Sequence, residues 1–271
     1  MQWKRGFITF CLTGLVTAVR YSNGSGCNSI TQIEGCESVG QIKNINGVDI
    51  YQSLPPDTNN RTQYKTILFV TDFYGIASIN NRLLADKIAL TNYRVVMPDL
   101  FNGDPVPMSM REGTPALNLT DWWARHPVSE IDAIVASTIV YIKESEIGGD
   151  AQKLGAVGYC LGGKHVPRFM ATGKGIDVGF IAHPANLTTD EVQAISGPIS
   201  IAAGELDDLW TKPLRRGAID ILEAENSTYQ QNLYSGALHG FGVRPNINVA
   251  RERYAKEAAY VQAIELMDAW L

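Results

Sequence analysis

Cysteine and histidine are scarce in this chain, which has four of each among its 271 residues. No group of them has the short spacing with which cysteines and histidines form zinc-binding motifs. A G-x-G-x-x-G loop, which would bind a dinucleotide phosphate, is also missing. We therefore expect no metal ion and no organic cofactor.

An excess of positive charge is missing as well, because 23 Lys and Arg face 28 Asp and Glu, for a formal net charge of -5. This composition provides no basic face for nucleic acid and no polybasic stretch for an anionic membrane. Internal repeats and low-complexity runs are absent too, which excludes a solenoid. With 45% apolar residues, the chain can bury one large core, and its expected partner is a small molecule. Composition does not determine its oligomeric state.

A long apolar run occurs only at the N-terminus. Lys4 and Arg5 precede the apolar stretch 7–19, and small residues at 16–18 fit the site that signal peptidase cleaves. A membrane anchor is the alternative, but the stretch is shorter than the roughly 20 residues that cross a bilayer. We predict a signal peptide over residues 1–18, cleaved after Ala18, and a secreted protein without membrane attachment.

Glycosylation sequons and a cysteine pair fit the same secretory route. Five Asn-x-Ser/Thr sequons are present, at Asn23, Asn60, Asn118, Asn186 and Asn226. Cys27 and Cys36 lie close together in a segment rich in Gly, Ser and Asn, so a local disulfide between them is predicted. The alternative is two free thiols at the surface.

Short apolar runs alternate with helical patterns along the rest of the chain. The runs at 66–71, 93–97, 153–157, 179–182, 199–203 and 229–234 read as buried strands. Helical patterns follow at 81–91, 129–145, 162–171, 212–225 and 249–270. This alternation predicts an α/β fold with a mostly parallel sheet and helices on both faces. The Pro-, Gly- and Met-rich region 101–125 has no clear period and reads as a long loop or small lid.

Cys160 stands in the segment GYCLGGK (158–164), directly between a predicted strand and a predicted helix. This is the nucleophile elbow of the α/β-hydrolases, with Cys where Ser is usual. Glycines beside the nucleophile allow the sharp turn, and the helix N-terminus favours a thiolate and presents the Leu161 amide to an oxyanion. A buried structural cysteine is the alternative reading.

A nucleophile at an elbow needs a histidine and an acid later in the chain. His239 follows the last predicted strand, where a loop reaches the carboxyl edge of the sheet, and it is the expected base. His183 follows an earlier strand and reads as a pocket wall. The loop GELDDLW (204–210) offers three carboxylates for orienting the histidine, and spacing does not choose among them: Glu205, Asp207 and Asp208.

Four segments together resemble the dienelactone hydrolase family (carboxymethylenebutenolidase-like proteins), in particular its fungal, secreted-type members. They are GYCLGGK, AGELDDLW (203–210), LHGFGVR (238–244) and the stretch 71–105, which begins TDFYG. The resemblance covers about residue 47 to the C-terminus. It implies an α/β-hydrolase domain over 47–271, preceded by an N-terminal segment at 19–46.

The resemblance also implies roles for single residues. The triad becomes Cys160, Asp207 and His239, and the Phe73 amide matches the second oxyanion donor. Asp72 resembles an acidic residue that contacts the resting thiol. Arg244 resembles an arginine of the family that meets the substrate carboxylate, although its spacing from the histidine differs by one residue from the bacterial pattern.

The predicted activity is hydrolysis of an ester or lactone through a covalent thioester. An acyltransferase on the same fold, which passes the acyl group to an amine, thiol or alcohol, is the first alternative. A non-catalytic ligand-binding member is the second.

Overall fold

The computed structural model describes residues 36–56, 64–112, 117–144 and 153–271. The predicted signal peptide 1–18, Cys27 of the predicted disulfide and the sequons at Asn23 and Asn60 lie outside these residues. Asn118, Asn186 and Asn226, the other sequon asparagines, are exposed.

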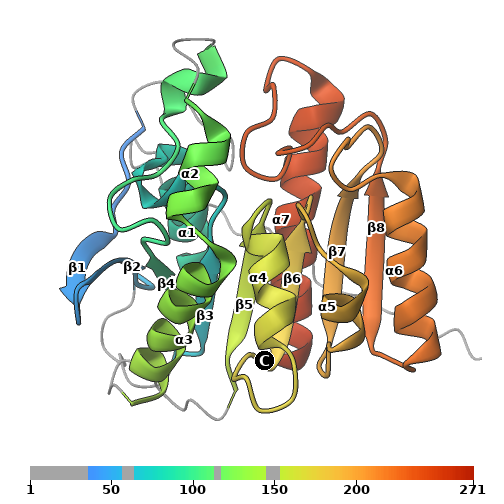
Figure 1. The fold of residues 1–271 in the computed structure, drawn as a ribbon, viewed down its shortest axis with the longest axis horizontal. Helices are drawn as coiled ribbons and strands as arrows, with labels where there is room; N and C mark the ends of the chain where they lie inside the picture. Colours follow the sequence, from blue (N-terminus) through green and yellow to red (C-terminus); the bar gives the residue numbers. More distant parts are fainter. Residues whose placement is uncertain (1–35, 57–63, 113–116, 145–152) are drawn as a thin grey trace, which may run out of the picture.

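Within the described residues, eight strands form one sheet in the order β1-β2-β4-β3-β5-β6-β7-β8 (Figure 1). Strands β3 to β8 are parallel, and β1 and β2 are antiparallel. Every residue of β3 to β7 is buried, as expected for strands covered on both faces. The strands are β1 (Gln41–Ile45), β2 (Val48–Ser53), β3 (Thr66–Val70), β4 (Arg94–Pro98), β5 (Gly155–Tyr159), β6 (Val178–Ala182), β7 (Ile199–Gly204) and β8 (Tyr229–Tyr234).

Helices cover both faces of this sheet, so its two sides hold separate apolar cores. One core contains residues of α3, α4 and α6, and the other contains residues of α1 and α7; Figure 1 shows α3, α4 and α6 in front of the sheet and α7 behind it. The helices are α1 (Ile79–Ala89), α2 (Leu119–Arg125), α3 (Val128–Glu144), α4 (Gly162–Phe169), α5 (Thr189–Gln193), α6 (Lys212–Ala224) and α7 (Ala250–Trp270), with 3-10 turns η1 (Gly75–Ala77) and η2 (Met108–Glu112). The α/β-hydrolase fold expected from the sequence is confirmed.

Strand order places the ends of β3 and β5 at a switch point. The chain leaves β3 toward β4 on one side, and β5 lies on its other side. In open α/β sheets, ligands bind beyond the carboxyl ends of strands at such a point. Asp72 and Phe73 follow β3, and Cys160 follows β5, so this end of the sheet brings the predicted site residues together.

The sequence patterns missed the hairpin of β1 and β2. β1 is exposed along most of its length and carries no apolar alternation, which suits a polar edge strand. Asn46 and Gly47, both with positive φ, form the turn, and Asn-Gly between two strands is a strong hairpin signal. The sheet therefore begins at Gln41, six residues before the start at 47 expected for the hydrolase domain.

Smaller differences concern element ends and the region 101–125. β5 runs to Tyr159, two residues beyond the expected end at 157, so the elbow follows the strand directly. The expected loop contains η2 and α2, whose start is capped by the Asn118 side chain accepting from the Thr120 and Asp121 N–H groups. Helix α5 was also missed because it is only five residues long.

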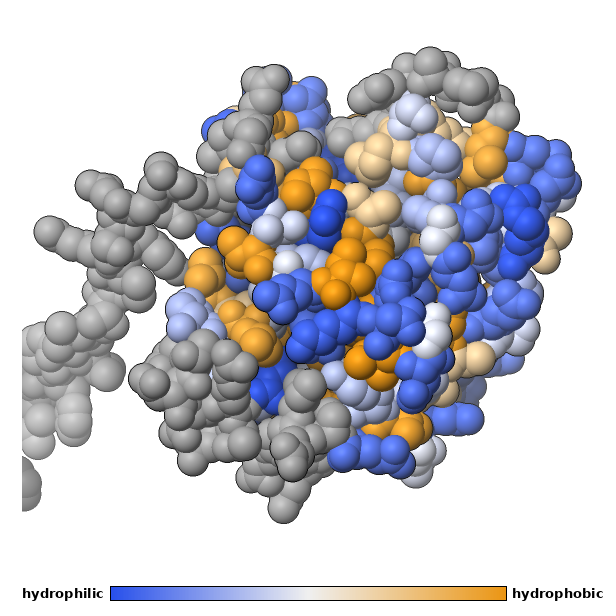
Figure 2. All heavy atoms as spheres, turned by 90° about the vertical axis from the view of Figure 1, so that its left-hand side faces the viewer, coloured by the Kyte–Doolittle hydropathy of each residue, from blue (hydrophilic) through white to orange (hydrophobic). Residues whose placement is uncertain are grey.

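The described part of the chain contains no helix long and apolar enough to cross a membrane. Figure 2 views the molecule from the side of β1 and shows hydrophobic side chains in separate patches among hydrophilic ones. Such scattered apolar residues are normal for a protein surface.

Candidate active site

Cys160 occupies a strained turn between β5 and α4. Its φ is +53°. Residues other than glycine rarely adopt such a positive φ, and those that do are often found at functional sites. The flanking glycines are required by close contacts: a Cβ on Gly158 would lie 2.3 Å from the Gly162 carbonyl oxygen, and one on Gly162 would lie 2.0 Å from that of Val70. The expected nucleophile elbow is therefore present in its geometry.

Backbone hydrogen bonds fix this turn to the neighbouring strands. The Cys160 N–H donates to the Ala182 carbonyl at the end of β6, and the Ala185 N–H donates to the Cys160 carbonyl. On the other side, the Gly162 N–H donates to the Thr71 carbonyl just after β3. The elbow thus has contacts on both sides that hold its backbone in place.

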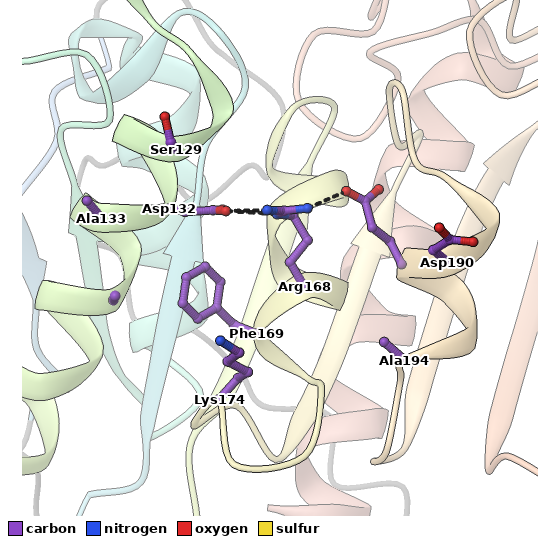
Figure 3. Close-up of a pocket in the computed structure, with 10 residues that line it drawn as sticks. Ser129, Asp132, Ala133, Arg168, Phe169, Lys174, Asp190 and Ala194 are labelled. Carbon is purple, nitrogen blue, oxygen red and sulfur yellow. Dashed lines mark hydrogen bonds and ion pairs between the residues drawn. The ribbon is translucent and has the colours of Figure 1, made fainter.

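Ion pairs hold the elbow helix α4 from outside. Arg168 bridges Asp132 on α3 and Glu191 on α5, and Lys164 also pairs with Glu191, at 2.7 Å. Asp132, Arg168 and Glu191 border a cavity of about 510 Å³ between the three helices, in which Figure 3 shows the Arg168 guanidinium directed at Asp132. No triad residue lines this cavity, and the ion pairs contribute to the site by holding α4 in place.

His239 lies on the loop after β8 and faces the elbow. Its Nε2 is 3.1 Å from Cys160 Sγ, and its Nδ1 is 3.0 Å from Asp207 Oδ1. Burial opposes the charged imidazole, but hydrogen bonds and charge at Asp207 and Cys160 outweigh it and raise the pKa of His239 to about 9. The geometry therefore favours a proton on the histidine beside the sulfur.

The structure brings Asp207, and not its neighbours, to the histidine. Asp207 is 4% exposed, and its Oδ1 accepts hydrogen bonds from the N–H groups of Leu209 and Trp210 as well as meeting His239. Asp208 is exposed. Glu205 turns away to the Ser235 hydroxyl and the Gly236 N–H. Of the three carboxylates that spacing left open, Asp207 is the one that the structure places in hydrogen-bond contact with His239.

Arg215 on α6 holds the loop that carries Asp207, and no feature of the sequence predicts this contact. Its guanidinium is buried and donates to the carbonyls of Gly204 and Trp210, at the two ends of the loop that carries Asp207. Arg215 therefore ties the two ends of this loop together from inside the protein.

His183 packs behind the histidine as a neutral ring. It is fully buried with a φ of +39°, and its ring meets that of His239 edge to face, with centroids 5.2 Å apart. Burial lowers the pKa of His183 well below its usual value, and the charges of His239 and Arg244 add to this. His183 thus restrains the His239 ring without competing for its proton, consistent with the pocket wall expected from the sequence.

Two backbone N–H groups, on the elbow and on the loop after β3, are candidates for binding an oxyanion. They belong to Leu161, next to Cys160 in the elbow, and to Phe73, after β3. Neither donates a hydrogen bond within the residues that the structure describes. Backbone N–H groups that are not used within the protein are the kind of donor that a tetrahedral oxyanion requires.

Asp72 departs from the expected contact with the thiol. Its Oδ1 accepts from the Tyr74 N–H and the Asn81 side-chain amide, and its Oδ2 accepts from Arg244 Nε at 2.9 Å. No hydrogen bond joins Asp72 to Cys160 in the described residues. The carboxylate is instead committed to holding its own loop and the guanidinium.

Arg244 is held against the Asp72 carboxylate and two aromatic rings. Its side chain is 10% exposed, and its guanidinium lies over the rings of Phe73 and Tyr74, at 5.6 and 4.8 Å from their centroids. Burial opposes its charge, but Asp72 and then Cys160 outweigh it and raise the pKa of Arg244 above its usual value. The arginine is therefore a paired, buried cation.

Together these groups can perform nucleophilic acyl chemistry: a thiol with a histidine in reach, a carboxylate orienting that histidine, and two N–H donors. Among the described residues, no group of His, Cys, Asp and Glu could hold a metal ion.

Comparisons with known proteins identify the family of this chain and agree with its fold. The model of the dienelactone hydrolase family matches residues 51–271. Hydrolase pyvD of Aspergillus violaceofuscus is 39% identical over 235 residues, 87% of this chain and 92% of that protein. Dienlactone hydrolase 1 of Gibberella moniliformis is 29% identical over 238 residues, 87% of this chain and 89% of that protein. The crystal structure of dienelactone hydrolase from Anabaena variabilis superposes with a TM-score of 0.60 at 14% identity, covering 86% of this chain and 99% of that one, and so shares the fold.

Proposed function

This chain belongs to the dienelactone hydrolase family and is a carboxylic ester hydrolase, and from this premise we propose that it cleaves an ester or lactone through a thioester on Cys160. The observation that carries the proposal is the 3.1 Å approach of His239 Nε2 to Cys160 Sγ in a strained elbow.

The proposed cycle has two halves. The proton that Cys160 and His239 share resides on His239 Nε2 as the sulfur attacks the carbonyl carbon, and the Leu161 and Phe73 amides bind the oxyanion. The C–O bond then breaks, and the leaving alkoxide takes the proton from His239. In the second half, neutral His239 takes a proton from water, the hydroxide attacks the thioester, and the carboxylic acid and the Cys160 thiol are released. Asp207 holds the His239 ring in the tautomer that both halves need.

Acyl transfer to an amine, thiol or alcohol is the alternative, because the elbow does not select the acceptor. Incubating the purified protein with a panel of lactones and aryl esters, and measuring carboxylic acid release, tests the proposal. Acid release above the non-enzymatic rate supports hydrolysis. Consumption of ester only when an amine or alcohol is added would instead establish a transferase, and no consumption would contradict both.

The pH dependence of acylation should depend on the leaving group. Below its pKa of about 9, His239 holds the proton that a departing alkoxide must take; above it, that proton is lost. For an ethyl ester, kcat/KM should therefore fall above pH 9 by about tenfold per pH unit. A p-nitrophenyl ester should keep its rate, because its phenolate leaves unprotonated. Parallel loss with both esters would show that His239 is not the acid.

We also propose that the protein is secreted, which the apolar N-terminus and the sequons support. The disulfide between Cys27 and Cys36 is proposed on the same grounds. When the full chain is expressed in a eukaryotic secretory host, the protein in the medium should begin near Val19 and lose mass on glycosidase treatment. An intact Met1 on protein retained in the cell would contradict this.

A further inference from the structure

The Phe73 N–H, one of the two candidate oxyanion donors, belongs to a tight turn after β3. In this turn, which runs from Asp72 to Gly75, the Gly75 N–H donates to the Asp72 carbonyl oxygen at 3.0 Å. A peptide unit is planar and trans, so its N–H and C=O groups point in opposite directions. The Asp72 carbonyl and the Phe73 N–H share one such unit. The hydrogen bond that closes the turn therefore also sets the direction of the Phe73 N–H.

One side chain from outside the turn is bonded to both of its ends. Asn81, the third residue of α1, donates from Nδ2 to Asp72 Oδ1 and to the Gly75 carbonyl oxygen, each at 2.9 Å. A carboxylate and a carbonyl oxygen can only accept, and the asparagine amide nitrogen has two hydrogens to donate. The NH₂ group of Asn81 thus joins the first and the last residue of the turn that contains Phe73.

Burial makes these two hydrogen bonds dry and makes Asn81 costly for its own helix. Asn81 and Asp72 are both 0% exposed, so water does not compete for the acceptors. Asn81 Oδ1 accepts no hydrogen bond within the described residues, and a buried acceptor without a partner lowers stability. An apolar side chain would therefore suit the packing of α1 better, whereas only a donor serves the turn.

Other hydrogen bonds of the turn do not depend on Asn81. The Tyr74 N–H donates to Asp72 Oδ1 at 3.1 Å. The Val106 N–H donates to the Phe73 carbonyl oxygen at 2.9 Å. These bonds remain when Asn81 is replaced, so the turn should loosen rather than unfold.

We propose that Asn81 is a positioning residue of the active site, which aims the Phe73 N–H by fixing both ends of its turn. The inference rests on the proposed hydrolysis, in which that N–H binds the oxyanion. Asn81 acts through the geometry of the turn and not by contact with the substrate. Its contribution should therefore appear only in reactions that form an oxyanion.

Two reactions of the same thiol separate this role from a general structural one. Acylation by p-nitrophenyl acetate passes through a tetrahedral oxyanion, whereas iodoacetamide loses iodide from a saturated carbon and forms none. For Asn81→Ala we expect kcat/KM for the ester to fall at least about tenfold, since losing an oxyanion donor outright costs about 10²- to 10³-fold. The second-order rate of Cys160 alkylation, measured at the same pH, should stay within about twofold of wild type.

Leu84→Ala is the matched control for stability. Leu84 lies on the same helix and is 1% exposed, so its truncation should lower the melting temperature and leave both rates within about twofold. Asn81→Ser is the second variant and serves if Asn81→Ala does not fold. Its hydroxyl has one hydrogen and can donate to only one of the two acceptors, so the same split between the two reactions is expected.

A loss confined to the ester supports the inference. An equal loss of both rates would make Asn81 a structural residue and overturn it, as would the same selective loss with Leu84→Ala. If wild type hydrolyses the ester no faster than Cys160→Ala, the proposed function fails and the inference with it. Wild-type hydrolysis that folded Asn81 variants retain within about twofold overturns the inference alone.

Discussion

Replacing Cys160 by alanine should lower kcat/KM for ester hydrolysis by at least about 10⁴-fold, because it removes the atom that forms the acyl-enzyme. The backbone should keep its turn, since the hydrogen bonds to Ala182 and Ala185 use main-chain atoms of residue 160. Steady-state kinetics on a p-nitrophenyl ester measures the loss, and circular dichroism and thermal unfolding confirm that the variant is folded.

Cys160→Ser is the matched control for the nucleophile. It keeps a nucleophilic oxygen at the same position, but a hydroxyl is much harder for His239 to deprotonate than a thiol. We expect a residual rate well below wild type and above Cys160→Ala. Mass spectrometry of wild type quenched during turnover should detect an acyl adduct on the peptide that contains Cys160. A folded Cys160→Ala variant with wild-type activity would reduce the thiol to a packing residue.

Replacing Asp207 by asparagine should lower kcat/KM by roughly 10³ to 10⁴-fold. The amide can still accept from the Leu209 and Trp210 N–H groups with its oxygen. It no longer stabilises an imidazolium at His239 Nδ1, so the pKa of His239 should fall from its raised value of about 9. The pH profile of the residual activity measures that fall, which a loss of folding alone would not produce.

Asp208→Asn provides the comparison one residue away. Asp208 is exposed while Asp207 is buried, so the same chemical change should leave kcat/KM within about twofold, as for most surface substitutions. The reverse ranking of the two variants would move the acid by one residue and contradict the arrangement at His239 Nδ1.

The local sequence was enough to locate Cys160 and the histidine that meets it. An elbow at Cys160 needs Gly158 and Gly162, because any Cβ there would meet backbone oxygen atoms. That requirement is short-range, so it is visible in a few consecutive letters. His239 could be found because strand and helix alternate, which fixes the order of loops at the carboxyl edge and puts this histidine after the last strand.

The hairpin of β1 and β2 shows what the hydrophobic pattern of the sequence does not reveal. A polar edge strand buries little apolar surface, so hydrophobic alternation does not reveal it. Its Asn46-Gly47 turn was the remaining signal. The family resemblance, which was carried by motifs between residues 71 and 244, did not compensate, because β1 lies before them.

The sequence by itself thus determined the α/β architecture, the elbow at Cys160 and the histidine that serves it, because these depend on periodicity and on short-range steric demands. Only the tertiary structure decided where side chains far apart in the chain meet. It turned Asp207 rather than Asp208 toward His239, through two backbone N–H groups of the same loop. It also joined Arg244 to Asp72, 172 residues away, and a pair at such separation exists only once folding has buried both charges together.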